Sequence, residues 1–240
     1  MILRRVAPGP ADELDTEAAG ARARLLEWYR PLAADSVRIN LVTTLDGRVA
    51  GDDGTSNSLT AGADRMILGV IREAADVVLV GAQSVRAEGY RLPKRAQLAI
   101  VTATGDLGGA AIQPRDGAAP VLVLTSAAGA RAAHRALGGV DHVVVPLPER
   151  AGRVAVADAL AALRDRGAAG IVCEGGPSLA AQVLATGSVD ELCLTTVPRW
   201  GGAGIRVPAV DDVPASRWKP RQLLIDDDGV LYARWVPRAG

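Results

Sequence analysis

Short apolar runs, separated by longer amphipathic segments, dominate the chain from residue 37 onward. Most of these runs are continuous Val, Leu and Ile, which is typical of strands buried on both faces of a parallel sheet. The pattern predicts strands at Val37–Val42, Val77–Val80, Leu98–Val101, Val121–Leu124, His142–Val145, Ile171–Cys173, Leu192–Val197, Leu223–Ile225 and Val230–Val236.

Helical segments lie between these predicted strands. Ala63–Ala75 follows Thr60, a candidate N-cap, and carries Asp64 in its first turn, where the helix dipole favours a carboxylate. Alternation of strands and helices predicts an α/β fold with a mostly parallel central sheet flanked by helices. The turn signal at residues 226–229 predicts that the last two strands form an antiparallel C-terminal hairpin. Further helices are predicted at Ala127–Leu137, Ala155–Arg166 and Ser178–Ala185.

The first residues follow a different pattern. Asp12–Tyr29 is rich in Ala, Glu and Arg, and its apolar positions fall close to helical spacing, so we expect one amphipathic helix that ends before Pro31. We therefore expect residues 1–36 to form an N-terminal helical extension and residues 37–240 to form one α/β domain.

Composition narrows the classes of function. Lys+Arg and Asp+Glu both number 27, so the chain lacks the basic excess of a general nucleic-acid binder. Cys173, Cys193, His134 and His142 are the only cysteines and histidines, and their spacing fits no zinc site, so we expect no metal. No apolar run is long enough for a leader or a membrane span, so we expect a soluble, cytoplasmic protein without membrane contact.

Three segments could carry chemistry. A polar loop follows the strand that ends near Asp46, and Gly81 follows a second buried strand. Glu174 ends a third strand and precedes Gly175, Gly176 and a proline at a position favoured in the first helical turn. Glycines between a strand and a helix allow a pyrophosphate to approach backbone N–H groups. Each segment by itself is also compatible with an ordinary turn.

Several arginines are candidates for binding an anion. Arg72 lies on an otherwise apolar helix, where a guanidinium is suited to a phosphate. Arg86, Arg91, Lys94 and Arg95 follow it, although exposed arginines are mostly only solvated.

Four motifs in order resemble the reductase domain of riboflavin biosynthesis, which has a dihydrofolate-reductase-like fold. The family's S-L-D-G-R is matched by Thr44-Leu-Asp-Gly-Arg48 and its S-x-W-I-T by Ser56-Asn-Ser-Leu-Thr60. Its R-A-x-x-D-A-I-L-V-G-x-x-T-V is matched by residues 72–85, and its E-G-G-x-x-L by residues 174–179. The resemblance runs from about Val37 to the C-terminus.

The resemblance implies which residues bind substrate and cofactor. The family reduces 5-amino-6-(5-phosphoribosylamino)uracil with NADPH, by hydride transfer to C1′ of the ribosyl group, and its members suggest a homodimer. As substrate contacts we expect Ser56, Thr60, Arg72, Arg91, Leu92, Arg95 and Glu174. As NADPH contacts we expect Val42, Thr44, Ser58, Gly81, Ala82, Gln83, Ser84, Glu88, Gly175, Gly176, Pro177, Ser178 and Leu179, with the run continuing to Gln182.

Asp46 and Glu174 are the carboxylates at strand ends that could manage protonation, and both are assigned as catalytic. Three positions depart from the family pattern: Ser58 replaces Trp, Ser84 replaces Thr, and Glu88-Gly-Tyr-Arg replaces D-D-P-x. A dihydrofolate or pteridine reductase on the same fold, or a non-catalytic NADPH-binding protein, therefore stays open. The family's zinc deaminase motifs H-x-E and C-x-x-C do not occur, so we expect a deaminase step to belong to another protein.

Overall fold

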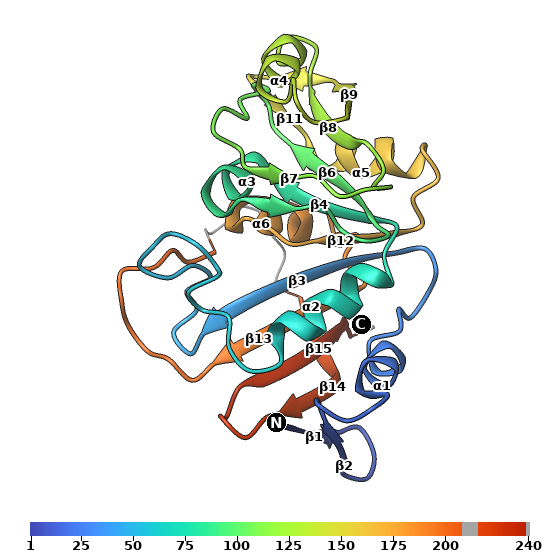
Figure 1. Cartoon of the computed structure of the whole chain (residues 1–240), viewed down its shortest axis with the longest axis vertical. Helices are drawn as coiled ribbons and strands as arrows, with labels where there is room; N and C mark the ends of the chain where they lie inside the picture. Colours follow the sequence, from blue (N-terminus) through green and yellow to red (C-terminus); the bar gives the residue numbers. More distant parts are fainter. Residues whose placement is uncertain (208–215, 239–240) are drawn as a thin grey trace.

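One eleven-stranded sheet runs through the computed structural model, which describes residues 1–207 and 216–238 (Figure 1). In spatial order its strands are Asp12–Asp15 (β2), Ile2–Ala7 (β1), Trp218–Ile225 (β14), Leu231–Pro237 (β15), Glu191–Val197 (β13), Ser36–Thr44 (β3), Gly170–Cys173 (β12), Val77–Gly81 (β4), Gln97–Val101 (β6), Val121–Ser126 (β8) and His142–Leu147 (β9). Two short two-stranded pairs accompany it, Tyr90–Arg91 (β5) with Ile112–Gln113 (β7) and Glu149–Arg150 (β10) with Arg153–Val154 (β11).

The sheet is parallel from β13 through β3, β12, β4, β6 and β8 to β9, and antiparallel at its other end. The mixed sheet predicted from the sequence is therefore confirmed, as is the C-terminal hairpin of β14 and β15. Asp226 holds the hairpin turn because its carboxylate accepts hydrogen bonds from the N–H groups of Asp228 (3.0 Å) and Val230 (2.9 Å). Gly229 supplies the positive φ of 76° that this turn needs.

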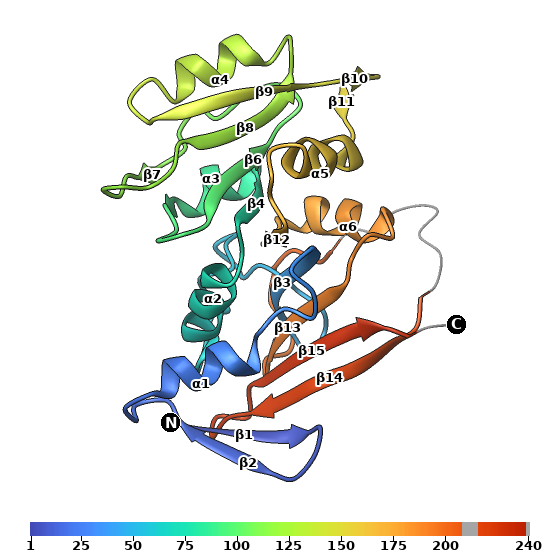
Figure 2. The ribbon, with the colours of Figure 1, turned by 90° about the vertical axis from the view of Figure 1, so that its right-hand side faces the viewer.

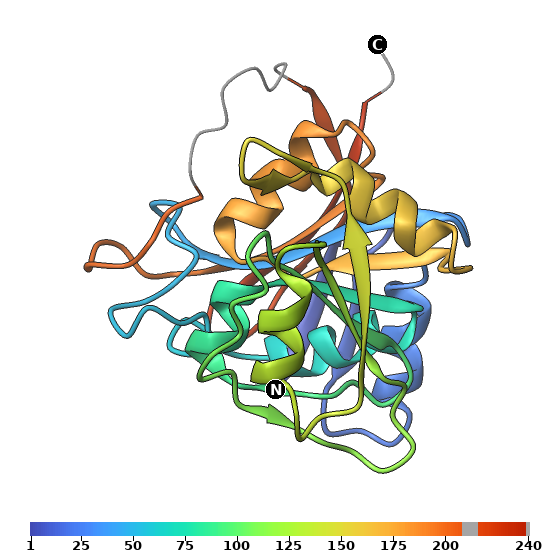
Figure 3. The ribbon, with the colours of Figure 1, turned by 90° about the horizontal axis from the view of Figure 1, so that it is seen from above.

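Helices cover both faces of the sheet (Figure 2). One hydrophobic cluster joins the sheet to the first four helices and a second joins it to the last two, so β4 is buried on both sides. Seen from above, the last two helices lie on the opposite side of the sheet from the third and fourth (Figure 3). The helices are Ala21–Trp28 (α1), Asp64–Glu73 (α2), Ala82–Glu88 (α3), Ala130–Ala136 (α4), Val156–Arg164 (α5) and Pro177–Ala185 (α6).

The N-terminal segment differs from the expected long helix. It begins with the hairpin β1–β2, and β1 pairs with β14, so the segment extends the sheet. Ion pairs between Arg4 and Glu13 (3.2 Å) and between Arg5 and Asp12 (3.0 Å) join the two strands. The helix is confined to α1 because Gly20 lies in the left-handed region immediately before it. The boundary at residue 36 stays a prediction.

A buried charged cluster ties this segment to the rest of the molecule. Glu191 on β13 accepts hydrogen bonds from Arg38 on β3 (2.6 and 2.9 Å) and from Arg234 on β15. The Arg234 guanidinium also donates to the carbonyl oxygens of Trp28 and Arg30, at the end of α1. Since the carbonyls at a helix C-terminus lack partners inside the helix, this arginine satisfies them from the sheet.

The start of α2 also differs from expectation. The helix begins at Asp64 with Ala63 as its N-cap, and the Ala63 N–H donates to the Tyr232 hydroxyl (2.7 Å). Thr60, the predicted cap, instead donates its hydroxyl to the Ser56 carbonyl (3.3 Å). Throughout the described ranges 1–207 and 216–238, none of the helices has the length and apolar character needed to cross a membrane.

Candidate active site

A cleft of about 790 Å³ lies where β3, β4, β6 and β12 end. Ligands in open α/β sheets bind at the carboxyl ends of parallel strands, so this is the position expected for a site. The cleft is lined by the loop that follows β3, by residues along α2 and α3, by the start of α6, and by the β11 strand. It is the candidate active site.

Two glycine turns meet inside this cleft. The Gly81 N–H donates to the Gly175 carbonyl (2.8 Å), which joins the end of β4 to the turn after β12. A Cβ at Gly176 would lie 2.7 Å from the Ser84 hydroxyl, so only glycine leaves the present spacing undisturbed. The sequence placed these turns about ninety positions apart, and the structure brings them together.

The α6 helix begins directly at this junction. Gly176 is its N-cap, Pro177 lies in its first turn, and no side chain caps its N-terminal N–H groups. Ser178 and Leu179 of this first turn line the cleft. Because uncapped N–H groups at a helix start attract anions, this end of α6 can receive a phosphate group.

Arg72, Glu174 and Tyr90 form a polar cluster in the cleft, and Glu174 directly precedes the Gly175–Gly176 turn. Arg72 on α2 donates from Nε and Nη2 to the two carboxylate oxygens of Glu174, at 2.6 and 2.7 Å. The Tyr90 hydroxyl contacts the Glu174 carboxylate, and Arg72 Nη2 lies 2.8 Å from the same hydroxyl. The guanidinium also lies over the Tyr90 ring, 5.1 Å from its centre. The cluster fixes the direction of the Glu174 carboxylate.

Burial explains the electrostatics of this cluster. Burial lowers the pKa of Arg72, but the Glu174 carboxylate and the Tyr90 hydroxyl raise it by more, so the guanidinium stays charged. Burial and the adjacent Glu174 raise the pKa of Tyr90 well above its usual range, so the phenol keeps its proton and can donate it in a hydrogen bond.

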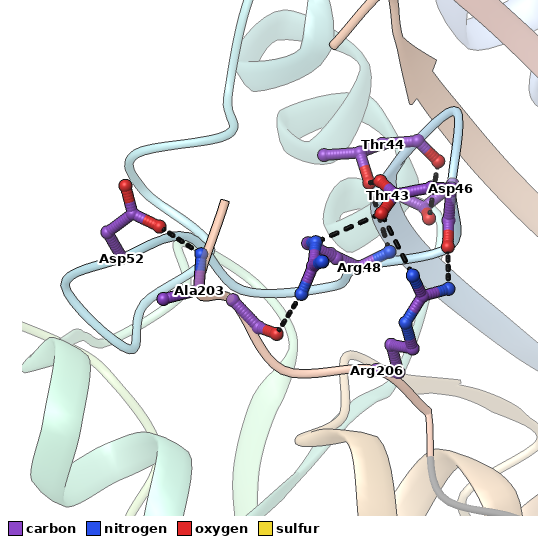
Figure 4. A network of polar contacts seen from close by, with 8 residues as sticks. Thr43, Thr44, Asp46, Arg48, Asp52, Ala203 and Arg206 are labelled. Atoms are coloured by element: carbon purple, nitrogen blue, oxygen red, sulfur yellow. Dashed lines mark hydrogen bonds and ion pairs between the residues drawn. The ribbon is translucent and has the colours of Figure 1, made fainter. Parts of the chain in front are cut away.

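Asp46 lies outside the residues that line the cleft. Its carboxylate accepts hydrogen bonds from Thr44 (2.6 Å), Arg48 (3.0 Å) and Arg206 (2.9 Å), as Figure 4 shows. The Thr44 hydroxyl and, after it, the nearby arginines hold the pKa of Asp46 below its usual range. The residue therefore closes the turn after β3 against the loop around Arg206, and Arg48 continues the contact to the Gly204 carbonyl (2.9 Å).

The polar loop after β3 is held by two carboxylates, one from the loop itself and one from α3. Ser58 donates its hydroxyl to Asp53 (2.7 Å), so this side chain turns away from the cleft. Glu88, at the end of α3, accepts hydrogen bonds from the Ser56 N–H (2.9 Å) and hydroxyl (3.2 Å). Glu88 thereby connects the loop to α3 on the cleft wall.

The structure brings most of the predicted site residues together. From the predicted substrate set and the predicted catalytic pair, those in the cleft lining are Ser56, Thr60, Arg72, Arg91 and Glu174. From the predicted cofactor set they are Val42, Gly81, Ala82, Gln83, Ser84, Glu88, Gly176, Pro177, Ser178, Leu179 and Gln182.

Eight predicted residues do not line the cleft: Asp46, Thr44, Ser58, Leu92, Arg95, Gly175, Ala180 and Ala181. Leu92 is buried in the core, and Arg95 extends toward Glu73 (3.8 Å). Arg86 donates to the Asp106 carbonyl (2.5 Å), away from the cleft lining. The arginines that do line the cleft are Arg65, Arg72, Arg91 and Arg153.

Asp64 and Tyr90 belong to the site but were not assigned to it from the sequence. Asp64, in the first turn of α2, lines the cleft and is only 7% exposed. Burial raises the pKa of Asp64, and the neighbouring side chains of Thr195 and Thr60 offset this only in part. A carboxyl group that holds its proton more tightly than usual is suited to proton transfer. The sequence signal was an acidic residue in the first turn, which helix electrostatics alone explains.

The remaining candidates for chemistry lie elsewhere. Cys173 and Cys193 are buried free thiols, and burial raises the pKa of each to about 12, which makes them unreactive. His134 and His142 contact each other through their ring nitrogens at 2.8 Å. In the part of the chain that the structure describes, no three His, Cys, Asp or Glu side chains gather as metal ligands.

Solved structures share this fold. A pyrimidine reductase-like protein from Corynebacterium diphtheriae is 21% identical, with a TM-score of 0.69 over 91% of this chain and 99% of that one. RibD from Acinetobacter baumannii is 19% identical, with a TM-score of 0.66 over 85% of this chain and 58% of that one. The riboflavin biosynthesis reductase Rib7 from Saccharomyces cerevisiae is 15% identical, with a TM-score of 0.62 over 90% and 98%.

The match to RibD covers little more than half of that protein. A search of the curated proteins found no match. The family model described as the RibD C-terminal domain matches residues 35–232, which include the four sequence motifs, both glycine turns and the Arg72–Glu174–Tyr90 cluster. By this match, the chain belongs to the RibD C-terminal domain family.

Proposed function

We propose that this chain is an NADPH-dependent reductase of riboflavin biosynthesis, which reduces the ribosyl side chain of 5-amino-6-(5-phosphoribosylamino)uracil to a ribityl chain. Family membership supports the reaction class. The observation that carries the proposal is the Arg72–Glu174–Tyr90 cluster, which lies in one cleft beside two joined glycine turns. A homodimer, expected from the family, and a cytoplasmic location, expected from the sequence, are part of the same proposal.

The residues of the cleft fit a pyridine dinucleotide. Gly81 and Gly176 leave room for close approach of a phosphate, and the uncapped start of α6 offers N–H groups beside them. Ser84 and Gln182 add polar side chains at the same junction. When bound, the nicotinamide supplies the hydride, and the protein supplies binding and orientation.

Two carboxyl groups of the cleft supply the proton transfer and the charge stabilisation that the reduction also requires. Reduction at C1′ also requires a proton at the ribosylamine nitrogen. Asp64 is the candidate donor because burial raises its pKa. Glu174, paired with Arg72, is suited to stabilise positive charge that develops at the reacting imine. Asp46, the other carboxylate assigned from the sequence, accepts hydrogen bonds from Thr44 and Arg48 in the turn after β3.

The substrate phosphate needs a cation other than Arg72, because Arg72 is engaged by Glu174 and Tyr90. Arg65 on α2 and Arg91 on β5 line the cleft and have no ion-pair partner within residues 1–207 and 216–238. A guanidinium grips phosphate through two parallel hydrogen bonds, so these two arginines are the proposed phosphate contacts.

A dihydrofolate or pteridine reductase is the second candidate. Two observations favour it, the pairing of Arg72 with Glu174 and the burial of Asp64. Arg72 is occupied, so the part of the cleft around it does not by itself demand a phosphorylated substrate. A buried Asp64 with a raised pKa also suits a pterin, which must be protonated as it is reduced. A protein that binds NADPH without turnover is the third.

The test is an assay of NADPH oxidation with three additions: the phosphoribosylamino pyrimidine, dihydrofolate, and neither. We expect oxidation with the pyrimidine phosphate to exceed that with dihydrofolate. Faster oxidation with dihydrofolate would establish the second candidate. Binding of NADPH with no oxidation in any arm would favour the non-catalytic protein.

A further inference from the structure

The cleft extends beyond the glycine turns, toward the β8 side of the sheet. Here the cleft is lined by Thr102 and Ala103, which follow the end of β6, and by Arg153, Val154 and Val156. The β10–β11 hairpin that carries Arg153 lies on the α5 side of the sheet (Figure 2). This end of the cleft has no part in the Arg72–Glu174–Tyr90 cluster.

The backbone beneath Arg153 is well anchored. Arg150 pairs in register with Arg153 across the hairpin, and its side chain bonds to Asp158 in the first turn of α5 (3.0 Å). Val154 is buried in the cluster beneath α5 and α6. The hairpin therefore presents the Arg153 side chain from a fixed position, at the edge of the cleft.

Arg153 itself is exposed and has no hydrogen-bond or ion-pair partner in the described part of the chain. The carboxylates that line the cleft are Asp64, Glu88 and Glu174. Asp64 lies on α2, Glu88 holds Ser56, and Glu174 is paired with Arg72. The β8 end of the cleft thus carries one cation and, among the described lining residues, no carboxylate.

This charge pattern distinguishes the two pyridine dinucleotides. A site for NAD presents a carboxylate to the 2′-hydroxyl of the adenosine ribose, whereas a site for NADP presents an arginine to the 2′-phosphate. A dinucleotide whose pyrophosphate lies at the glycine turns, with its nicotinamide toward Glu174, would place its adenosine at the opposite end of the cleft. Val154 and Val156 offer apolar surface to an adenine there.

We propose that Arg153 binds the 2′-phosphate of NADPH and makes the protein select NADPH over NADH. The inference rests on the proposed function for the presence of the cofactor, and adds the residue that determines its identity. Arg153 reaches the phosphate from outside the four sequence motifs, because the β10–β11 hairpin brings it to the cleft.

The test is ligand binding, which needs no substrate. Dissociation constants for NADPH, NADH, 2′,5′-ADP and 5′-ADP are measured by calorimetry for wild type, Arg153→Ala and Arg131→Ala. Arg131 is an exposed arginine of α4 outside the cleft lining and controls for the loss of one surface charge. We expect Arg153→Ala to weaken NADPH and 2′,5′-ADP by about 10- to 100-fold, the range for a charge-assisted hydrogen bond, and to leave NADH unchanged. Arg131→Ala should change none of the four.

The outcomes separate this inference from the proposed function. Unchanged binding of NADPH and 2′,5′-ADP by Arg153→Ala, or equal losses for NADPH and NADH, would overturn the role of Arg153 and leave the reductase proposal standing. A selective loss in a protein that reduces no substrate would support Arg153 and contradict the reductase. A wild type that binds none of the four ligands would overturn both. Circular dichroism of each variant shows whether it is folded.

Discussion

Arg72 and Glu174 are 102 positions apart in the sequence and form two parallel hydrogen bonds of 2.6 and 2.7 Å inside the cleft. The sequence assigned Arg72 to a substrate phosphate and Glu174 to catalysis. Their pairing suits Arg72 to a second role beside the predicted one, because a guanidinium held by a carboxylate orients that carboxylate. The pair links α2 to the end of β12, so the same contact serves the fold and the site.

The first prediction concerns the coupling of this pair. Arg72→Gln or Glu174→Gln alone leaves a partly buried charge without its partner, which should lower the free energy of unfolding by about 1–3 kcal/mol. In the double variant neither charge is left alone, so the loss should be smaller than the sum of the two single losses. Urea unfolding of the four proteins measures this. Strictly additive losses would show that the pair is not coupled.

The second prediction concerns Tyr90 and Glu174 in turnover. Tyr90→Phe keeps the ring beneath Arg72 but removes the hydroxyl that contacts Glu174, so kcat per folded molecule should fall by about tenfold. Glu174→Gln removes the charge itself and should lower kcat by about 100-fold or more. NADPH affinity should change little in either, because the proposed phosphate contacts lie at the glycine turns.

Tyr29→Phe is the matched control for this experiment. Tyr29 is another buried tyrosine beside an arginine, Arg234, and it lies outside the cleft. Its loss of a hydroxyl should leave kcat unchanged. If Tyr90→Phe and Tyr29→Phe behave alike, Tyr90 does not orient Glu174.

The third prediction concerns pH and Asp64. Burial raises the pKa of Asp64 above its ordinary value of 3.8, so the folded protein binds this proton more tightly than the unfolded chain. The free energy of unfolding of the wild type should therefore fall as pH rises from the ordinary value through the raised one. Asp64→Asn lacks this decline, so its stability relative to wild type should increase as pH rises above the ordinary value of 3.8.

Asp53→Asn serves as a control with the opposite sign. The Thr55 N–H and the hydroxyls of Ser58 and Thr55 lower the pKa of Asp53. The stability that Asp53 contributes is present above its ordinary pKa and is lost as pH falls, so Asp53→Asn should lose stability relative to wild type as pH rises. Thermal unfolding is measured below the ordinary pKa of 3.8, where the Asp53 effect lies, and above it, where the Asp64 effect lies. Equal slopes for the two variants would contradict the assignment of a raised pKa to Asp64.

The fourth prediction concerns the glycine junction. Gly176→Val places a branched side chain against Ser84, whose hydroxyl lies 2.7 Å from the position of a Cβ at residue 176. The side chain would occupy the space proposed for a phosphate, so the Kd of NADPH should rise about tenfold or more, equivalent to ~1.4 kcal/mol. Gly139→Val is the control, because a Cβ at Gly139 meets nothing within 4 Å. Unaltered NADPH binding by Gly176→Val would mean that this turn serves the fold alone.

Elements marked by a local sequence pattern could be predicted, whereas elements that depend on contacts distant in the sequence could not. The buried strands β4, β8 and β12 could be predicted because continuous apolar runs are a local signal. The β1–β2 hairpin could not, because its strands are joined by ion pairs such as Arg4–Glu13 and β2 falls within the residues 12–29 whose apolar positions fit helical spacing. Only the pairing of β1 with β14, more than two hundred residues later, makes the strand assignment favourable.

In the site, too, features with a local sequence signal were predicted and features that depend on packing were not. The glycine turns and Glu174 were found from the sequence because each follows a buried strand. The consequences of packing were not found: Arg206 reaches Asp46 from a distant loop, and burial makes Asp64 an unusual acid. Both effects depend on neighbours that a local pattern does not reveal.

Transfer of deuterium from NADPH to the pyrimidine tests the central claim most directly. The protein is incubated with NADPH deuterated at nicotinamide C4, on each face in turn, together with 5-amino-6-(5-phosphoribosylamino)uracil, and the product is analysed by mass spectrometry and NMR. The account predicts a ribityl product with one deuterium at C1′ from one of the two labelled cofactors. A pyrimidine recovered unreduced, or reduced without label at C1′ from either cofactor, would contradict it.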